Sequence, residues 1–222
     1  MLTYQLINLS KVRYRHVCST SLPKTQTTSK RLHKAFSANF SKKEDRLENE
    51  RIYYKSSNNQ HQSFIHDIPL SPDIKHLEEG GSSNLLLNMV IEIPRNRIAK
   101  REASLELECN PIVQDTKKYD GVERLRFLKF FPLFNYGFLP QTWEDPDKTS
   151  THGDFKGDGD PVDVIELSPS IPKVGEILEV QVLGSMGLID EGEMDWKVIV
   201  VDQEYHQKVS KKINLKRRKQ LS

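Results

Sequence analysis

Hydrophobic residues occur in short runs along most of the chain, with little of the periodicity that marks amphipathic helices. The strongest run, LLLNMVIEIP at 85–94, is almost continuously apolar and stops at a proline, which is typical of a buried strand. Further β-like runs lie at 51–55, 63–70, 124–131, 162–167, 177–186 and 195–202. Because Gly and Pro separate these runs, the pattern predicts a small β-barrel.

Charge divides the chain into three zones, although the formal net charge of the 222 residues is only +2. Residues 1–43 contain nine Lys or Arg and no acid, residues 144–195 contain fourteen Asp or Glu against three Lys, and residues 207–222 are basic again. We therefore expect a basic N-terminal segment at 1–43, a barrel domain at 44–204 and a flexible basic tail at 205–222.

The N-terminal zone favours one compartment. Its many Arg, Lys, Ser and Thr residues and its lack of acids are typical of a mitochondrial targeting segment, so the matrix is favoured and the cytoplasm is the alternative. No apolar run approaches the length of a membrane span, so no membrane partner is expected. Two cysteines, Cys18 and Cys109, do not indicate a disulfide framework.

The segment GDGDPVDVIE at 157–166 places three aspartates within six positions. A turn explains Asp158 and Asp160, since Asp and Gly form turns readily, but Asp163 already enters a β-branched run. Pro161 breaks the register of a calcium loop of the EF-hand kind, and zinc prefers His and Cys. Hard divalent cations with oxygen ligands remain, and we predict Mg²⁺ or Mn²⁺.

A second acidic group, LIDEGEMDWKVIVV at 188–201, lies between apolar runs and contains Lys197 two residues after Asp195. Lys100 and Glu102 show the same spacing, which places both on one side of an extended chain. Arg126 alternates with apolar neighbours in RLRF. Carboxylates can hold metal ions while Lys and Arg hold phosphate oxygens, so the pattern predicts a metal–polyphosphate site.

These residues lie in segments that resemble the soluble family I inorganic pyrophosphatases of the eukaryotic type. Seven segments carry the resemblance, in the order of the family: FIHDIPL, NMVIEIPRNRIAK, NPIVQDTKK, RLRF, NYGFLPQTWEDP, GDGDPVDVIEL and LIDEGEMDWKVIVVD. A single DxDPxD motif is moderately specific, whereas seven segments in order are highly specific.

The resemblance implies a mainly β (α+β) fold with a five-stranded, OB-like closed barrel. It implies an inorganic diphosphatase of phosphate metabolism that uses Mg²⁺, with Mn²⁺ as a substitute, to hydrolyse pyrophosphate to two phosphates. Asp160 would be the catalytic base and Glu92 a supporting carboxylate. The implied metal ligands are Asp158, Asp163, Asp195, Asp190 and Glu102. The implied contacts to substrate phosphate are Lys100, Arg126, Tyr136 and Lys197.

The sequence also departs from the family pattern. The loop before Asn135 is shorter than usual, and the basic tail stands where the family continues into C-terminal helices, so we expect those helices to be missing. The shorter loop, together with Asn96 where the family usually has an aromatic residue, weighs against the family's homodimer. These departures leave as an alternative a catalytically impaired relative that binds metal or phosphate. A nucleic-acid-binding OB-like module is disfavoured because the central acidic zone would repel phosphates.

Overall fold

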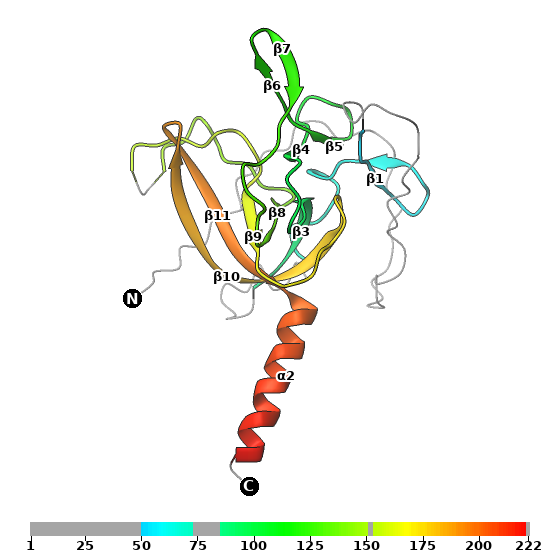
Figure 1. Cartoon of the computed structure of the whole chain (residues 1–222), viewed down its shortest axis with the longest axis vertical. Coiled ribbons are helices and arrows are strands. Elements are labelled where there is room, and N and C mark those ends of the chain that lie inside the picture. The colour runs from blue at the N-terminus through cyan, green and yellow to red at the C-terminus, as the bar shows by residue number, and fades with distance from the viewer. Residues whose placement is uncertain (1–49, 73–84, 151–152, 221–222) are drawn as a thin grey trace.

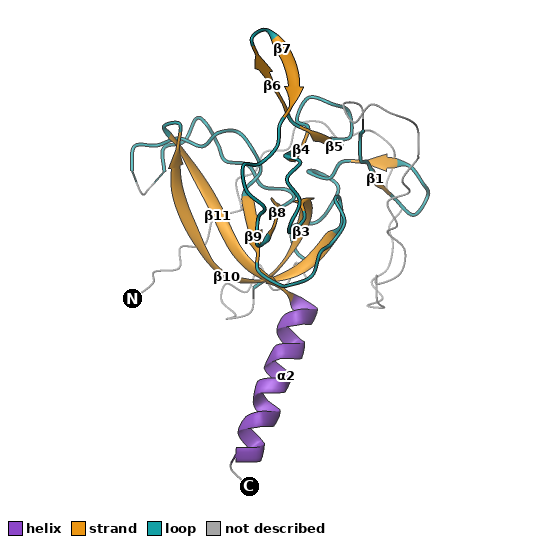
Figure 2. Cartoon of the chain, in the orientation of Figure 1, coloured by secondary structure: helices purple, strands orange, loops and turns teal. Residues whose placement is uncertain are grey.

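The computed structural model describes residues 50–72, 85–150 and 153–220. The described residues form a mainly β structure with one helix (Figures 1 and 2). Its strands are β1 (Tyr54–Lys55), β2 (His61–Gln62), β3 (Leu86–Ile93), β4 (Arg101–Ala103), β5 (Ile112–Gln114), β6 (Thr116–Tyr119), β7 (Val122–Leu125), β8 (Asn135–Phe138), β9 (Asp163–Glu166), β10 (Ile177–Asp190) and β11 (Glu193–Asp202). The helix is α2 (Gln203–Gln220).

Five of these strands hydrogen bond in a closed ring, in the order β10, β11, β9, β8, β3 and back to β10. The neighbouring strands are antiparallel except β11 and β9, which run parallel. The mainly β prediction is therefore confirmed. The pairs β1–β2, β4–β5 and β6–β7 form separate two-stranded sheets outside the ring.

Alternation along the ring strands builds the core. In β3, Leu87, Met89 and Ile91 join one buried cluster, while Val90 points to the other face and packs with Phe64 and Phe138. Residues of β9, β10 and β11 complete the first cluster: Val164, Val180, Val198 and Val200. Because β3 is covered on both faces, it reads as a continuous apolar run in the sequence, as the pattern predicted.

One predicted strand is absent from the described structure and another is only partly formed. Residues 63–70 form turns, because the Ser63 hydroxyl accepts the N–H groups of Ile65 and His66, and Asp67 accepts the N–H of Ser63. The run 124–131 belongs to β7 only at its first two residues, Arg124 and Leu125. The prediction was wrong for 63–70 and for 126–131, because the apolar residues there lie in turns and loops rather than on one face of a sheet.

Helix α2 differs from the irregular tail that the charge pattern led us to expect. Asp202 ends β11, and its Oδ1 accepts the N–H of Tyr205 at 2.7 Å, which caps the helix. The flexibility of this segment and the domain boundaries stay predictions, and the basic segment at 1–43 lies outside the described residues. Within the part of the chain that the structure describes, no helix has both the length and the apolar character needed to cross a membrane.

Candidate active site

The aspartate-rich loop is held against the segment around Glu144 by backbone hydrogen bonds. The Glu144 N–H donates to the Asp160 carbonyl at 2.8 Å, and the Gly159 N–H donates to the Glu144 carbonyl at 2.9 Å. A Cβ atom at Gly157 would lie 2.4 Å from the Glu144 carbonyl oxygen, so no side chain fits there. Gly157 therefore permits the close approach that places Asp158 beside Glu144.

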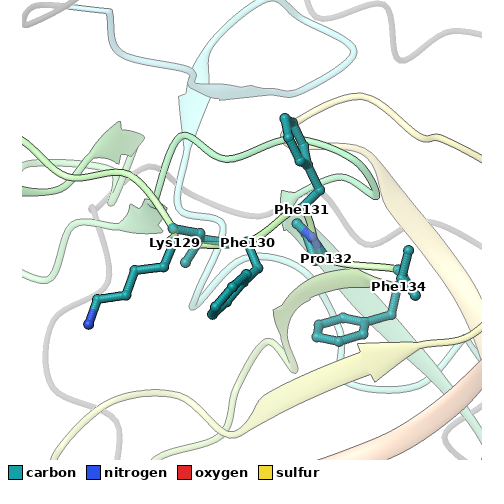
Figure 3. A pocket seen from close by; sticks show the side chains of 7 residues that line it. Lys129, Phe130, Phe131, Pro132 and Phe134 are labelled. Atoms are coloured by element: carbon teal, nitrogen blue, oxygen red, sulfur yellow. The ribbon is translucent and has the colours of Figure 1, made fainter.

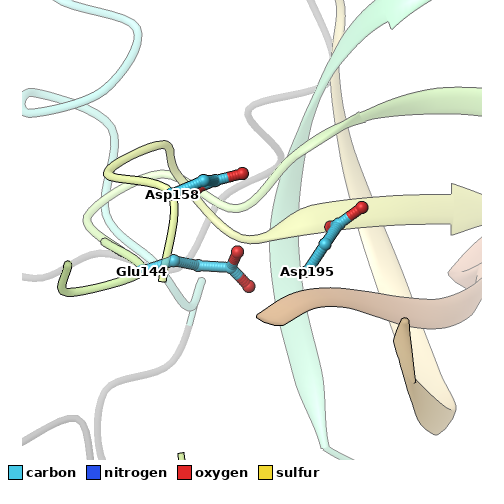
Figure 4. Close-up of side chains that lie close together, drawn as sticks. All are labelled: Glu144, Asp158 and Asp195. Atoms are coloured by element: carbon cyan, nitrogen blue, oxygen red, sulfur yellow. The ribbon is translucent and has the colours of Figure 1, made fainter. Parts of the chain in front are cut away.

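Glu144, Asp158 and Asp195 form a carboxylate cluster (Figure 4). One carboxylate oxygen of each residue lies within 4.8 Å of the other two. The Trp196 N–H, next to Asp195 on β11, donates to Glu144 Oε1 at 2.9 Å and orients it. Three oxygen ligands at this separation fit a hard divalent cation. The sequence predicted two members of this cluster, Asp158 and Asp195, but not Glu144.

Asp163, Tyr136 and Lys197 meet on three neighbouring ring strands, β9, β8 and β11, next to this cluster. The parallel register pairs Lys197 of β11 with Asp163 of β9. The Lys197 ammonium hydrogen bonds with Asp163 and with Asp195 Oδ1, the latter at 2.5 Å, and lies 5.5 Å from the centre of the Tyr136 ring. The Tyr136 hydroxyl donates to Asp163 Oδ2 at 2.5 Å. Register thus assembles three predicted residues, Tyr136, Asp163 and Asp195, around the ammonium group of a fourth, Lys197.

Electrostatic repulsion marks this region. Burial raises the pKa of Glu144 to about 8; the hydrogen bond from the Trp196 N–H opposes this shift, and repulsion by Asp158 and Asp195 adds to it. Burial also raises the pKa of Asp163, although Lys197 counteracts it. For Lys197, burial works against the charged form, yet Asp163 and Asp195 raise its pKa. One ammonium group therefore does not neutralise the carboxylates, and a cation would relieve the excess negative charge.

A second polar group lies on β4 and the segments after β5 and β7. The Lys100 ammonium donates to Glu102 at 2.8 Å and to Asp115 at 2.9 Å. The Arg126 guanidinium also pairs with Asp115. Asp115 holds both cations, and sequence reasoning did not identify it. Lys100, Arg126 and Glu102 were predicted, and the structure brings them together.

Glu92 and Asp160 lie between the two polar groups. Glu92 is only 6% exposed and accepts the Ala103 N–H at 2.7 Å. Burial raises its pKa well above the ordinary value, and Asp163, Glu102 and Asp160 add repulsion. Although Asp160 as a residue is exposed, local burial of its carboxyl group and then repulsion by Asp158 raise its pKa to about 6. A carboxylate with this pKa suits a general base near neutral pH.

Asp190 lies apart from the other predicted residues. It is exposed next to the turn between β10 and β11, where its register partner is Glu193. Among the described residues, no hydrogen bond or ion pair joins it to the clusters above. Its role as a metal ligand stays a prediction.

The apolar hollow in Figure 3 offers no site for a cation. Residues 128–134 line it, with Lys129 as their one charged residue and Phe130 81% exposed. The hollow contains no carboxylate, so the candidate site is the carboxylate region rather than this loop.

Neither Glu144 nor Asp115 carries a local signal that separates it from an ordinary solvated acid. Both lie in segments quoted for the family resemblance, TWEDP and VQDTK, and neighbouring acids or turn residues surround them. Their partners are distant in the sequence, so only the fold reveals that Glu144 joins the aspartates and that Asp115 bridges two cations.

The raised pKa of Glu144 predicts how stability depends on pH in chelated protein. An unfolded Glu titrates near 4.5, whereas folded Glu144 keeps its proton up to about pH 8. Between these values the folded state binds more protons, so the free energy of unfolding falls as pH rises. Gln has no titratable proton, so Glu144→Gln should flatten this fall. Between pH 4 and pH 8–9 the variant should lose roughly 3–5 kcal/mol less of its free energy of unfolding than the wild type does.

Urea unfolding at each pH measures this effect. Glu191→Gln, at an exposed position in the turn between β10 and β11, is the matched control and should leave the slope unchanged. If the free energy of unfolding has the same slope against pH in wild-type protein and in Glu144→Gln, folded Glu144 does not hold a proton up to about pH 8. Added Mg²⁺ should flatten the wild-type slope, because a cation lowers the pKa of its carboxylate ligands.

Comparison with known proteins assigns the chain to a group of enzymes. The sequence model of the family described as "Inorganic pyrophosphatase" matches residues 89–221. Inorganic pyrophosphatase of Candida albicans is 47% identical over 145 residues, which are 63% of this chain and 46% of that protein. The Drosophila melanogaster enzyme is 44% identical over 156 residues, 68% of this chain and 43% of that protein. The chain thus spans less than half the length of these two relatives.

One further relative is a mitochondrial enzyme by name, and solved structures of inorganic pyrophosphatases share the fold of this chain. "Inorganic pyrophosphatase, mitochondrial" of Saccharomyces cerevisiae is 46% identical over 149 residues, 63% of this chain and 44% of that protein. Type I inorganic pyrophosphatase from Toxoplasma gondii superposes with a TM-score of 0.63 at 40% identity, covering 69% of this chain and 64% of that one. A truncated Trypanosoma cruzi vacuolar soluble pyrophosphatase in complex with PPi gives 0.59 at 38% identity, covering 69% and 58%.

Proposed function

Because this chain belongs to the inorganic pyrophosphatase family, we propose that it catalyses the Mg²⁺-dependent hydrolysis of pyrophosphate to two phosphates. Mn²⁺ would serve as a substitute metal. One observation supports this activity above others: the Glu144–Asp158–Asp195 carboxylate cluster adjoins the Lys197 ammonium, and Asp160 interacts electrostatically with both Asp158 of this cluster and Lys100 of the second polar group. A polyphosphate with bound divalent cations needs both kinds of group side by side. The closed ring of strands would be the OB-like barrel of the family.

The proposed metal ligands are carboxylates. Asp158 and Asp195 face a common space with Glu144, and Asp163 shares the Lys197 ammonium with Asp195. Glu102 and Asp190 would contribute to further cation positions. When bound, a divalent ion lowers the pKa of a coordinated water from about 15.7 to around 7 and stabilises charge on the leaving phosphate.

Asp160 would accept the proton of the attacking water. The raised pKa of its carboxyl group, about 6, strengthens it as a base while leaving it mostly ionised at neutral pH. Glu92 of β3 would be a supporting carboxylate, because its buried carboxyl group interacts electrostatically with Asp160 and Asp163.

Cationic and hydroxyl groups would bind the substrate. Lys100 and Arg126 share Asp115, which holds their charges at one side of the site. Lys197 and Tyr136 contact Asp163 from the other side. Groups held in place before substrate arrives lose little freedom when they bind phosphate oxygens, so they favour orientation of the reacting bond.

The compartment is also part of the proposal. The acid-free composition of residues 1–43 favours the mitochondrial matrix. The mitochondrial name of the Saccharomyces cerevisiae relative agrees with this.

Substitution of a proposed metal ligand tests the function. Asp195→Asn should raise the Mg²⁺ concentration for half-maximal phosphate release by at least about 10- to 100-fold, the loss seen even for groups outside the ligand shell. Phosphate release from pyrophosphate across a Mg²⁺ titration measures it, with Glu193→Gln, an exposed acid on the same strand, as control. Folded wild-type protein without Mg²⁺-dependent release would instead favour the non-catalytic relative that binds metal or phosphate.

A further inference from the structure

Helix α2 concentrates positive charge in an ordered element. Its sequence, QEYHQKVSKKINLKRRKQ, has one acid, Glu204, and seven Lys or Arg, at 208, 211, 212, 216, 217, 218 and 219. The side chain of Lys208 is 73% exposed, and Lys211 and Lys212 are exposed as well. We propose that α2 is a docking surface for double-stranded DNA, which it binds through the phosphate backbone. This role is separate from pyrophosphate hydrolysis.

The base of α2 is tied to the ring. The Asp202 N–H donates to Glu166 Oε1 at 2.9 Å, and the fully buried Glu166 also accepts from Asn135 of β8 at 2.7 Å. Asp202 then caps the helix through the N–H of Tyr205. Beyond this base the helix extends away from the ring (Figure 1), so the ring leaves Lys208, Lys211 and Lys212 open to a large partner.

The fold separates these basic residues from the acidic site. The sequence disfavours nucleic acid because the central acidic zone would repel phosphates. In the structure, Asp195 lies near the start of β11 and α2 follows its end at Asp202. Seven residues of strand span roughly 23 Å. This exceeds the Debye length of about 8 Å at physiological ionic strength, so repulsion from the Glu144–Asp158–Asp195 cluster is largely screened where α2 begins.

The composition of α2 favours DNA over a lipid surface. Membrane-surface helices present a broad apolar face, whereas only four of the 18 residues of α2 are apolar: Tyr205, Val209, Ile213 and Leu215. Single-stranded nucleic acid is bound largely by stacking of bases on aromatic side chains. Helix α2 contains one Tyr, Tyr205, and no Phe or Trp, so it offers little surface for stacking. A helix fits the major groove of B-DNA but not the deep, narrow groove of duplex RNA.

Fluorescence anisotropy with the full chain and a labelled DNA duplex of about two helical turns tests the proposal. Wild-type protein should bind with a dissociation constant of about 10⁻⁴–10⁻⁶ M at physiological salt, and more tightly at low salt. In the triple variant Lys208→Gln, Lys211→Gln, Lys212→Gln, the slope of log affinity against log salt should shrink by about 2.7, since each lost phosphate contact removes about 0.9.

A matched variant separates α2 from general surface charge. Lys117→Gln, Lys118→Gln, Lys129→Gln removes three exposed lysines outside α2 and should keep the wild-type slope. Circular dichroism and thermal melting confirm that both variants are folded. Equal slopes for the two triple variants, or absence of duplex binding at low salt, would overturn the proposal. So would tighter binding to single strands or to anionic phospholipid vesicles, or self-association in sedimentation that requires the α2 lysines.

Discussion

Asp160→Asn is expected to lower kcat for pyrophosphate hydrolysis by about 10²–10⁴-fold, the usual contribution of a positioned base. The amide cannot take a proton from water, although it keeps the size of the side chain. Burial and repulsion by Asp158 already disfavour the charged carboxylate, so the neutral amide should not destabilise the fold. Phosphate release at saturating Mg²⁺ and pyrophosphate, together with a thermal melt, measures both effects.

The same experiment separates a base from a metal ligand. In Asp160→Asn the Mg²⁺ concentration for half-maximal activity should stay within a few-fold of wild type, in contrast to Asp195→Asn. Asp154→Asn, which removes an exposed acid from the same acidic zone, is the control and should retain wild-type activity. An Asp160→Asn protein with full kcat would show that another group accepts the proton.

Lys197→Met is expected to lower the free energy of unfolding of Mg²⁺-free protein by about 3–5 kcal/mol. The Lys197 side chain is only 11% exposed and pairs with both Asp163 and Asp195. Its loss leaves these two carboxylates facing each other with little solvent, and breaking a buried pair is costly for this reason. Urea unfolding in the presence of a chelator measures the change, and added Mg²⁺ should recover part of it.

An exposed ion pair provides the control. Lys148→Met removes the partner of Asp145, but the Lys148 side chain is 67% exposed, so we expect less than about 1 kcal/mol. Similar losses for the two variants would mean that the Lys197 contacts contribute no more than a surface pair. If Lys197→Met does not fold, Lys197→Arg keeps the charge and should retain more stability than Lys197→Gln.

The parts of the site that sequence reasoning found are those with a short-range signal. Asp158, Asp160 and Asp163 stand out because three acids within six residues repel one another unless a cation or solvent separates them. Lys197 stands two residues from Asp195, and the structure pairs the two at 2.5 Å. Residues two positions apart on an extended chain lie on the same side of it, so these pairs can be recognised from the sequence without knowledge of the fold.

The parts it missed depend on contacts between distant segments. Glu144 reads as a solvated acid before a proline, and only the pairing of its backbone with Asp160 turns it toward Asp158 and Asp195. Asp115 likewise looks ordinary until Lys100 and Arg126 converge on it. Their burial and their contacts in the fold, rather than their residue type, identify these two acids as members of the site.

For helix α2 too, the sequence reveals the charge but not the contacts that order the helix. Its charge is plain in the sequence, but the N-terminal cap and the anchored first turn depend on Asp202 and Glu166 at the ends of ring strands. The basic composition and low apolar content predicted a flexible tail, whereas tertiary anchoring orders the helix start.

The sequence by itself determined the β-rich class, the strands at β3, β9, β10 and β11, the family resemblance and the aspartate-rich loop, because period-two alternation and charge spacing act over a few residues. Only the tertiary structure decided which acids share a site and that α2 begins far from the Glu144–Asp158–Asp195 cluster. Both depend on closure of the strand ring, which brings residues distant in the chain within a few ångströms and sets their burial. Residues 63–70 turn rather than extend because Ser63 and Asp67 accept nearby N–H groups, which the β-like run of apolar residues did not reveal.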